Sequence, residues 1–133
     1  MIDRAACARR KGVAVGYPVV HFEINSATAP ALAQFYAEAF DWSLQADGPD
    51  YTQIRTNGVC AGTGAPGIDG GIGPSEPGDD FVTVYVQVPD VSEALQRVVA
   101  LGAQVDMPAA ETGRVVIGIF RDPAGNRIGL VRG

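Results

Sequence analysis

Histidine and cysteine are scarce in this sequence of 133 residues, which holds one histidine, His21, and two cysteines. Cys7 and Cys60 have neither the spacing of a metal site nor the density of a disulfide-bonded scaffold. We expect two free thiols, because structural disulfides belong to oxidising environments. A reducing compartment, the cytoplasm, is therefore the predicted location.

Basic clusters interleaved with aromatic residues are missing as well, and so are long hydrophobic runs. The net charge is −5 and no basic cluster is interleaved with aromatic residues, so we expect no nucleic-acid partner. The apolar run at residues 13–15, which follows the basic N-terminal residues, is shorter than the core of a signal peptide. No window has the length of a membrane span, so no membrane partner is expected either.

The length suits one domain with a core of its own. Residues 1–16 are rich in alanine and arginine without a strong periodicity, which predicts an N-terminal tail. An ordered extra strand or a packed turn remains open for that segment. The domain itself is expected over residues 17–133.

Residues 19–25, VVHFEIN, alternate between apolar and polar side chains. This alternation predicts a strand with one apolar face on a core and one polar face that carries His21, Glu23 and Asn25. The single histidine of the chain thus lies on a polar strand face.

A helix is predicted over residues 30–40, where apolar side chains recur at helical spacing and a proline suits the first turn. Ser26 or Thr28 is expected to cap it. The alternation at residues 43–47 and 51–56 predicts two strands.

Residues 57–80 are rich in glycine and proline and are expected to form mostly loop, with at most a short strand near residues 68–72. A phosphate-binding loop is not expected, because the run lacks its Lys-Ser/Thr ending and does not enter a helix.

The second half repeats this plan. Residues 82–88 alternate as a strand, and a helix follows with Asp90 as N-cap, Glu93 three residues on and Gly102 at its end. Three further strands are predicted at residues 103–107, 114–121 and 127–132.

The order of a strand, a helix and about three strands is therefore stated twice, over roughly 55 residues each time. Neither half buries enough apolar surface alone, so we expect one α+β domain made of a duplicated unit. If the helices cover the apolar strand faces, the two polar faces look toward each other.

Five motifs carry a resemblance to a known family: VVHFEI, AQFYAEAFDW, GGIGP, FVTVYVQVPDVSEAL and FRDPAGNRIGLV. Over residues 18–131 the chain resembles the vicinal oxygen chelate superfamily, the group of glyoxalase I, bleomycin-resistance proteins and extradiol dioxygenases. The resemblance implies two βαβββ modules, residues 17–76 and 80–133, in a single glyoxalase-like domain with a curved mixed sheet around a cleft.

Members that do metal chemistry place four His or Glu ligands on the first, fourth, fifth and eighth strands. The resemblance puts the first position on His21 and the other three near Gly71, on Thr83 and on Gly129, none of which can hold a divalent ion. A catalytic metal needs at least three protein ligands, and His21 with Glu23 is one short. We therefore expect no metal and no cofactor, and no metal-dependent glyoxalase or dioxygenase activity.

A polar and aromatic pocket that binds an organic molecule is the site hypothesis that remains. Its expected ligand-binding residues are His21, Glu23, Thr83, Tyr85, Gln87 and Gly129, with Trp42 and Tyr51 as walls.

His21 and Glu23 are also the candidate catalytic pair, as a general base and its carboxylate partner. Residues two apart on a strand lie about 6 to 7 Å apart, so a direct bond between them needs long rotamers or a water molecule. A histidine that only binds ligand or backbone is the alternative. Cys60 is either a nucleophile activated by His21 or an inert thiol. Arg55 and Arg121 either bind an anionic ligand or are solvated residues at strand ends.

Three functions follow as hypotheses. The favoured one is metal-free binding of a small organic molecule of unknown identity. The others are an isomerase or lyase that uses His21 and Glu23 for proton transfer, and a structural or regulatory module without a ligand. We also expect a homodimer, with the apolar run at residues 115–120 as its surface, unless that run is a strand buried on both faces.

Overall fold

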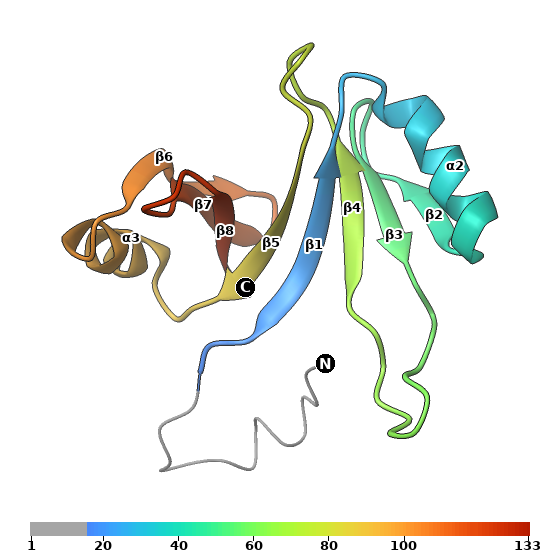
Figure 1. The fold of residues 1–133 in the computed structure, drawn as a ribbon, viewed down its shortest axis with the longest axis horizontal. Helices are drawn as coiled ribbons and strands as arrows, with labels where there is room; N and C mark the ends of the chain where they lie inside the picture. The colour runs from blue at the N-terminus through green and yellow to red at the C-terminus, as the bar shows by residue number, and fades with distance from the viewer. Residues whose placement is uncertain (1–15) are drawn as a thin grey trace. The chain divides into compact units, whose positions relative to one another are not determined.

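The computed structural model describes residues 16–133. The tail predicted for residues 1–16, with Cys7, lies outside the described residues except for Gly16. Internal contacts divide the described chain into two units (Figure 1). Residues 21–82 make up the first unit, and residues 17–20 with 83–133 make up the second.

The first unit follows the predicted order of a strand, a helix and three strands. Its strands pair in the order β2-β3-β4-β1, with β1 parallel to β4 and the other neighbours antiparallel. The short strand expected near residues 68–72 is confirmed. The elements are β1 (Val19–Asn25), α2 (Ala29–Phe40), β2 (Ser43–Ala46), β3 (Thr52–Arg55) and β4 (Asp69–Gly73).

The start of α2 differs from the prediction in its cap. Thr28 is the N-cap residue, but its side chain makes no capping hydrogen bond. Ser26 Oγ instead accepts a hydrogen bond from the Thr28 backbone N–H at 3.1 Å, as part of the turn before the helix. Pro30 lies in the first turn as expected, where its missing N–H costs nothing.

Side chains from α2 and one sheet face form the core of the first unit. Ala29 and Ala33 of the helix pack with Ile54 of β3 and Ile72 of β4, and Phe22 of β1 packs against them. Because strand side chains alternate, the neighbours of these core residues point to the opposite face. The polar residues of β1 therefore lie on the face away from α2.

The glycine-rich segment between β3 and β4 is a hairpin loop rather than an open coil. Val59 and Pro66 form an isolated antiparallel bridge, and the Cys60 N–H donates to the Ala65 carbonyl at 2.7 Å. Cys60 is a free thiol within this loop.

The second unit repeats the topology of the first. Its strands pair in the order β5-β8-β7-β6, again with the first strand parallel to the fourth and the rest antiparallel. The duplicated βαβββ plan and the α+β class are thus confirmed. The elements are β5 (Phe81–Gln87), α3 (Val91–Ala100), β6 (Gln104–Thr112), β7 (Val115–Arg121) and β8 (Arg127–Arg132).

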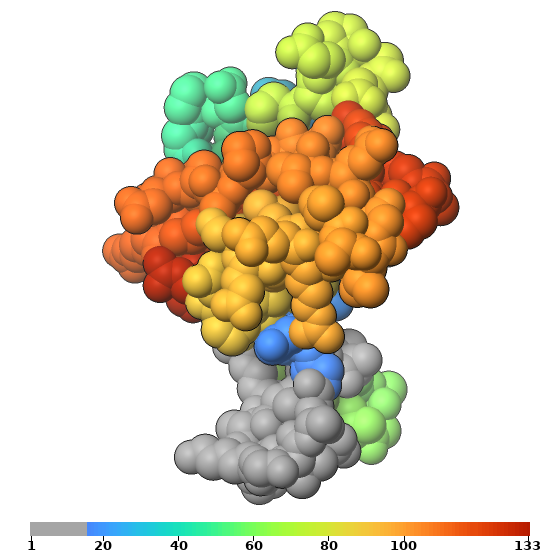
Figure 2. Space-filling view, turned by 90° about the vertical axis from the view of Figure 1, so that its left-hand side faces the viewer, coloured from blue at the N-terminus to red at the C-terminus, as the bar shows by residue number. Residues whose placement is uncertain are grey.

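Local signals around α3 act as predicted. The Asp90 side chain accepts the Glu93 backbone N–H at 3.0 Å, and Gly102 adopts a φ of 105° just after the helix. Figure 2 shows the surface of α3 and β6, in orange. Strand β6 continues past the predicted end at residue 107, because register shifts between Val105 and Ala110 accommodate its proline.

Strand β7 holds the apolar run that was considered for a dimer surface. It pairs with β6 on one edge and β8 on the other, so residues 115–120 offer no unpaired strand edge. The homodimer stays a prediction.

No helix in the described part of the chain is long and apolar enough to cross a membrane.

Candidate functional site

The candidate site lies in the first unit, on the sheet face away from α2. The pairing of β1 with β4 sets His21 beside Asp69 and Glu23 beside Gly71. His21 and Glu23, the predicted catalytic pair, thus stand next to a strand that carries glycine in its middle.

Tyr51 covers these glycines. It lies immediately before β3, and a Cβ at Gly71 would overlap its hydroxyl and ring. A Cβ at Gly73 would lie 3.1 Å from Tyr51 Cδ2. The Asp47 N–H donates to the Tyr51 carbonyl at 2.8 Å and fixes the backbone at this point. Glycine in β4 therefore leaves the room that the tyrosine ring occupies.

The Tyr51 hydroxyl joins the two predicted catalytic residues. It lies 3.0 Å from His21 Nε2 and donates to Glu23 Oε2 at 3.1 Å. Its one hydrogen goes to Glu23, so His21 Nε2 supplies the hydrogen of the other bond. The imidazole lone pair is then on Nδ1. The sequence placed Tyr51 as a wall of the site, whereas in the first unit it is the centre of a hydrogen-bonded chain.

Burial lowers the pKa of His21 below its usual 6.5, because the charged imidazolium loses solvation. The negative charges of Glu23 and Asp69 oppose this effect and raise the pKa in part. His21 is therefore neutral at pH 7, the form in which an imidazole accepts a proton or a hydrogen bond. Asp69 was missed from the sequence, because only the register of the glycine-rich strand brings it beside His21.

Trp42 lies on the other face of the first unit. Its ring stacks on Tyr36 of α2 at 5.8 Å between centroids and is 5.6 Å from that of Phe22. Trp42 thus packs against the hydrophobic core and does not join His21. The sequence around the end of α2 does not indicate which face of the sheet Trp42 covers.

The remaining predicted site residues belong to the second unit. The Thr83 hydroxyl, in a residue only 3% exposed, donates to the Arg127 carbonyl at 2.7 Å. Tyr85 pairs with Gly129, and its ring fills the space where a Cβ at Gly129 would project. In both units, therefore, a tyrosine ring covers a glycine of the last strand.

Gln87 contributes to a different feature of the second unit. It lines a shallow pocket together with Val88 and Pro89, next to Tyr17 and Arg132. Gln87 is exposed, whereas Tyr85 is buried.

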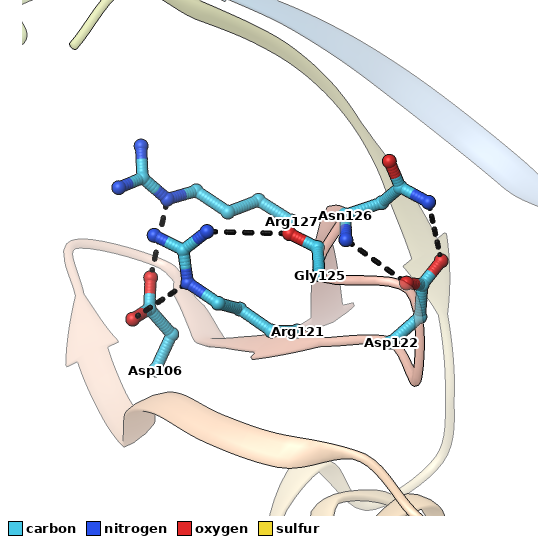
Figure 3. A network of polar contacts seen from close by, with 6 residues as sticks. All are labelled: Asp106, Arg121, Asp122, Gly125, Asn126 and Arg127. Carbon is cyan, nitrogen blue, oxygen red and sulfur yellow. Dashed lines mark hydrogen bonds and ion pairs between the residues drawn. The ribbon is translucent and has the colours of Figure 1, made fainter.

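Arg121, considered as part of an anion grip, is held within the second unit (Figure 3). Its Nε lies 3.5 Å from Asp106 Oδ1, and its guanidinium donates to the Gly125 carbonyl at 3.2 Å. Arg127 Nε lies 3.4 Å from the other oxygen of Asp106. The Asp106 carboxylate thus faces two arginines, and Arg121 serves the closing turn instead of an exposed anion site.

The side chains at the expected ligand positions do not fit the divalent metal ion that the resemblance implies. Among residues 16–133, no three His, Cys, Asp or Glu side chains gather as a metal site requires. The fourth-strand position, Gly71, is covered by the Tyr51 ring, and the hydroxyl at the fifth-strand position, Thr83, is bonded to a backbone carbonyl. These positions therefore supply no set of ligands for a divalent ion.

The sequence matches the family of glyoxalase-like domains over residues 21–131. The chain belongs to this family. Its predicted place in the vicinal oxygen chelate superfamily is thereby confirmed, and a match of this length covers both βαβββ modules. No curated protein matches the chain by sequence.

Solved structures of glyoxalase-like proteins share the fold. A glyoxalase/bleomycin resistance protein/dioxygenase superfamily member from Vibrio splendidus 12B01 is 14% identical with a TM-score of 0.60, covering 89% of this chain and 100% of its own. A methylmalonyl-CoA epimerase variant from Streptomyces coelicolor, in complex with 2-nitronate-propionyl-CoA, is 14% identical with a TM-score of 0.60, covering 88% and 94%. The Mn(II)-bound glyoxalase from Novosphingobium aromaticivorans is 15% identical with a TM-score of 0.62, covering 93% of this chain and 40% of its own. At these identities the likeness concerns the fold alone.

Proposed function

We propose that this glyoxalase-like protein binds a small organic molecule, without a metal ion, on the polar face of the first unit around His21, Tyr51 and Glu23. The observation that carries the proposal is the Tyr51 hydroxyl, which lies over Gly71 and bonds both His21 and Glu23. A metal bound to His21 Nε2 would have to displace that hydroxyl, and residue 71 supplies no donor in exchange. An organic ligand needs only hydrogen bonds and contact area from the same groups.

Metal content and ligand binding test this proposal together. Protein purified without added metal is expected to contain far less than one equivalent of Mn, Fe, Ni or Zn by elemental analysis, and to bind MnCl2 no more tightly than His21→Ala does. One firmly bound divalent ion per chain would contradict the proposal. Because the ligand is unknown, a library of small aromatic and hydroxylated compounds serves as the probe, with the single His21 NMR signal as readout.

The compound screen has a matched control on the same sheet face. Gln45 lies on exposed strand β2 and aligns with Gln53, on the face that carries Tyr51. A compound bound at the proposed site is expected to lose affinity in Glu23→Gln and to bind Gln45→Leu unchanged. A library without any compound that shifts the His21 signal would leave the ligand-free structural module as the better description.

The chain from His21 through Tyr51 to Glu23 favours one second function, an isomerase or lyase that transfers a proton. His21 Nδ1 would remove a proton from a carbon next to a substrate carbonyl, leaving the electron pair in the enolate. The imidazolium formed would be stabilised through Tyr51 by the Glu23 carboxylate, and would return the proton to the enolate. The epimerase among the structural neighbours has the same fold, which makes such a step compatible with it.

Deuterium exchange separates the enzyme from the binder. With 2-hydroxyacetophenone and related ketones in D2O, proton transfer predicts loss of the α C–H NMR signal faster than in buffer. His21→Ala should abolish the exchange while ligand affinity falls much less, because only the transition state needs the base. Binding without any catalysed exchange would assign the chain to the first function.

A further inference from the structure

Within residues 16–133, the side-chain amide nitrogen of Asn25 is buried without a hydrogen bond. The residue is 5% exposed, and its Nδ2 has no hydrogen-bond partner among the described residues. An unpaired buried amide donor lowers the stability of the folded state by about 1 to 3 kcal/mol. Such a group therefore calls for an explanation, for instance a hydrogen bond to a bound ligand. A leucine, whose side chain has the same branched skeleton, would remove this cost.

The Asn25 amide and the Tyr51 ring border the same point above Gly73. The position of a Cβ on Gly73 lies 3.1 Å from Asn25 Oδ1 and 3.1 Å from Tyr51 Cδ2. The hydroxyl end of the ring lies above Gly71, two residues earlier on the strand. A planar ring with a hydroxyl therefore has its hydroxyl between His21 and Glu23 and its other end beside Asn25.

A ligand can take this place only when the Tyr51 side chain turns away from it. The exposed segment 47–50 precedes Tyr51, whose carbonyl stays bonded to the Asp47 N–H. If the ring turns away, a hollow floored by the backbone of Gly71 and Gly73 opens. The hydroxyl contacts at His21 and Glu23 then become available to a molecule shaped like the departing phenol.

The charge of the first unit limits what such a molecule can be. Residues 21–82 contain one basic residue, Arg55, against nine carboxylates, a formal net charge of −8. Residues 17–20 and 83–133 contain five of each sign. Glu23 and Asp69 stand directly at the site. An anionic ligand is disfavoured there, whereas a neutral or cationic one is not.

We infer that the ligand is an uncharged or cationic hydroxyaryl molecule whose ring takes the place of the Tyr51 ring and whose acceptor atom receives a hydrogen bond from Asn25 Nδ2. The inference rests on the proposed function, of which it names the ligand class. Asn25 is then a specificity residue, and Tyr51 is a displaceable cover.

Matched probes test the class. 4-Hydroxybenzamide is neutral and carries both the hydroxyl and a carbonyl, 4-hydroxybenzoate replaces the amide by a carboxylate, and benzamide lacks the hydroxyl. 4-Hydroxybenzamide is expected to shift the NMR signals of His21 and of the Asn25 side-chain amide. The other two are expected to bind about tenfold more weakly, the effect of losing one hydrogen bond or of meeting like charge.

Variants test the two roles. Asn25→Leu is expected to weaken 4-hydroxybenzamide about tenfold without lowering the urea midpoint, whereas Gln45→Leu changes neither quantity. Tyr51→Phe keeps the ring but loses its two hydroxyl contacts, so the cover is easier to displace and the amide probe binds several-fold more tightly.

Three results would overturn the inference. If 4-hydroxybenzamide binds Asn25→Leu as tightly as the wild type and still shifts the His21 signal, Asn25 is not a specificity residue. The proposed function would still stand. If 4-hydroxybenzoate binds more tightly than 4-hydroxybenzamide, the site does not disfavour anionic ligands, and the inferred ligand charge is wrong. If no probe shifts the His21 or Asn25 signals in the wild type or in Tyr51→Phe, the hydroxyaryl class is wrong, and the compound library then decides the proposed function separately.

Discussion

Tyr51 and Gly71 share one volume on the polar face of the first unit, since the hydroxyl of Tyr51 lies where a side chain at residue 71 would begin. The hydrogen bonds of that hydroxyl to His21 and Glu23 depend on this arrangement. Glycine at residue 71 thus does more than lack a metal-ligating side chain, because it admits the Tyr51 ring to the same place.

Gly71→Ala should therefore destabilise the protein through Tyr51. We expect a loss of about 1 to 3 kcal/mol in the free energy of unfolding, because the added methyl group displaces the ring from its contacts. In a Tyr51→Ala background the same substitution should cost much less, and a double-mutant cycle in urea measures the difference. Gly58→Ala is the control, since its Cβ would make only an ordinary contact at 3.7 Å. Equal costs in both backgrounds would refute the coupling.

The titration of His21 follows from its burial. Its pKa is expected below 6.5, and Glu23→Gln should lower it further because the Glu23 charge raises it. Since the folded-state pKa is depressed, this group contributes stability that is present above pH 6.5 and is lost as the pH falls through the folded-state value. The chain has one histidine, so its Cε1–H signal can be followed by NMR without assignment. An upward shift in Glu23→Gln would contradict this account.

The sequence predicts most of the fold because its signals are local. Alternation in VVHFEIN placed β1 at its observed bounds, and the spacing from Asp90 to Glu93 placed the start of α3 with its capping bond. The two errors of detail, the cap of α2 and the end of β6, arise where tertiary contacts compete with local preference. Ser26 is drawn into bonds with Asp80, 54 residues away, and the proline in β6 is tolerated at a register shift.

The candidate site is less predictable, because it depends on register across strands. His21 and Glu23 were recognised from alternation within one strand. Their connection through Tyr51 depends on the pairing of β3 with β4 and on two glycines, and no short sequence pattern encodes it. The burial of the Asn25 amide has the same origin.

Asp80 ties the segment before β5 to the turn after β1. Its carboxylate accepts hydrogen bonds from the Ala27 N–H at 3.1 Å, from Ser26 Oγ at 2.9 Å and from Ser75 Oγ at 3.0 Å. The bond from the Ala27 backbone, then those from the two serines, lower the pKa of Asp80 below 3.8. A depressed carboxyl pKa contributes stability above the unfolded value, which is lost as the pH falls through the folded one.

Asp80→Asn should accordingly lower the thermal midpoint at pH 7, and the difference from the wild type should shrink well below pH 3.8. Thermal unfolding monitored by circular dichroism at several pH values measures both effects. Glu76→Gln, a nearby change from acid to amide, is the control and should shift the midpoint little at either pH. A deficit in Asp80→Asn that does not depend on pH would show that the carboxylate charge is not the cause.

Thr83, expected from the sequence to bind ligand, has its hydroxyl committed to the Arg127 carbonyl at 2.7 Å. Thr83→Val keeps the shape but removes the donor and leaves a carbonyl beside a methyl group, so we expect about 1 to 2 kcal/mol less stability in urea unfolding. Thr83→Ser retains the hydroxyl and should lose less of the hydrogen-bond contribution. If Thr83 is structural, Thr83→Val also leaves the binding of 4-hydroxybenzamide unchanged. A weakened affinity with unchanged stability would instead return Thr83 to the ligand-binding residues.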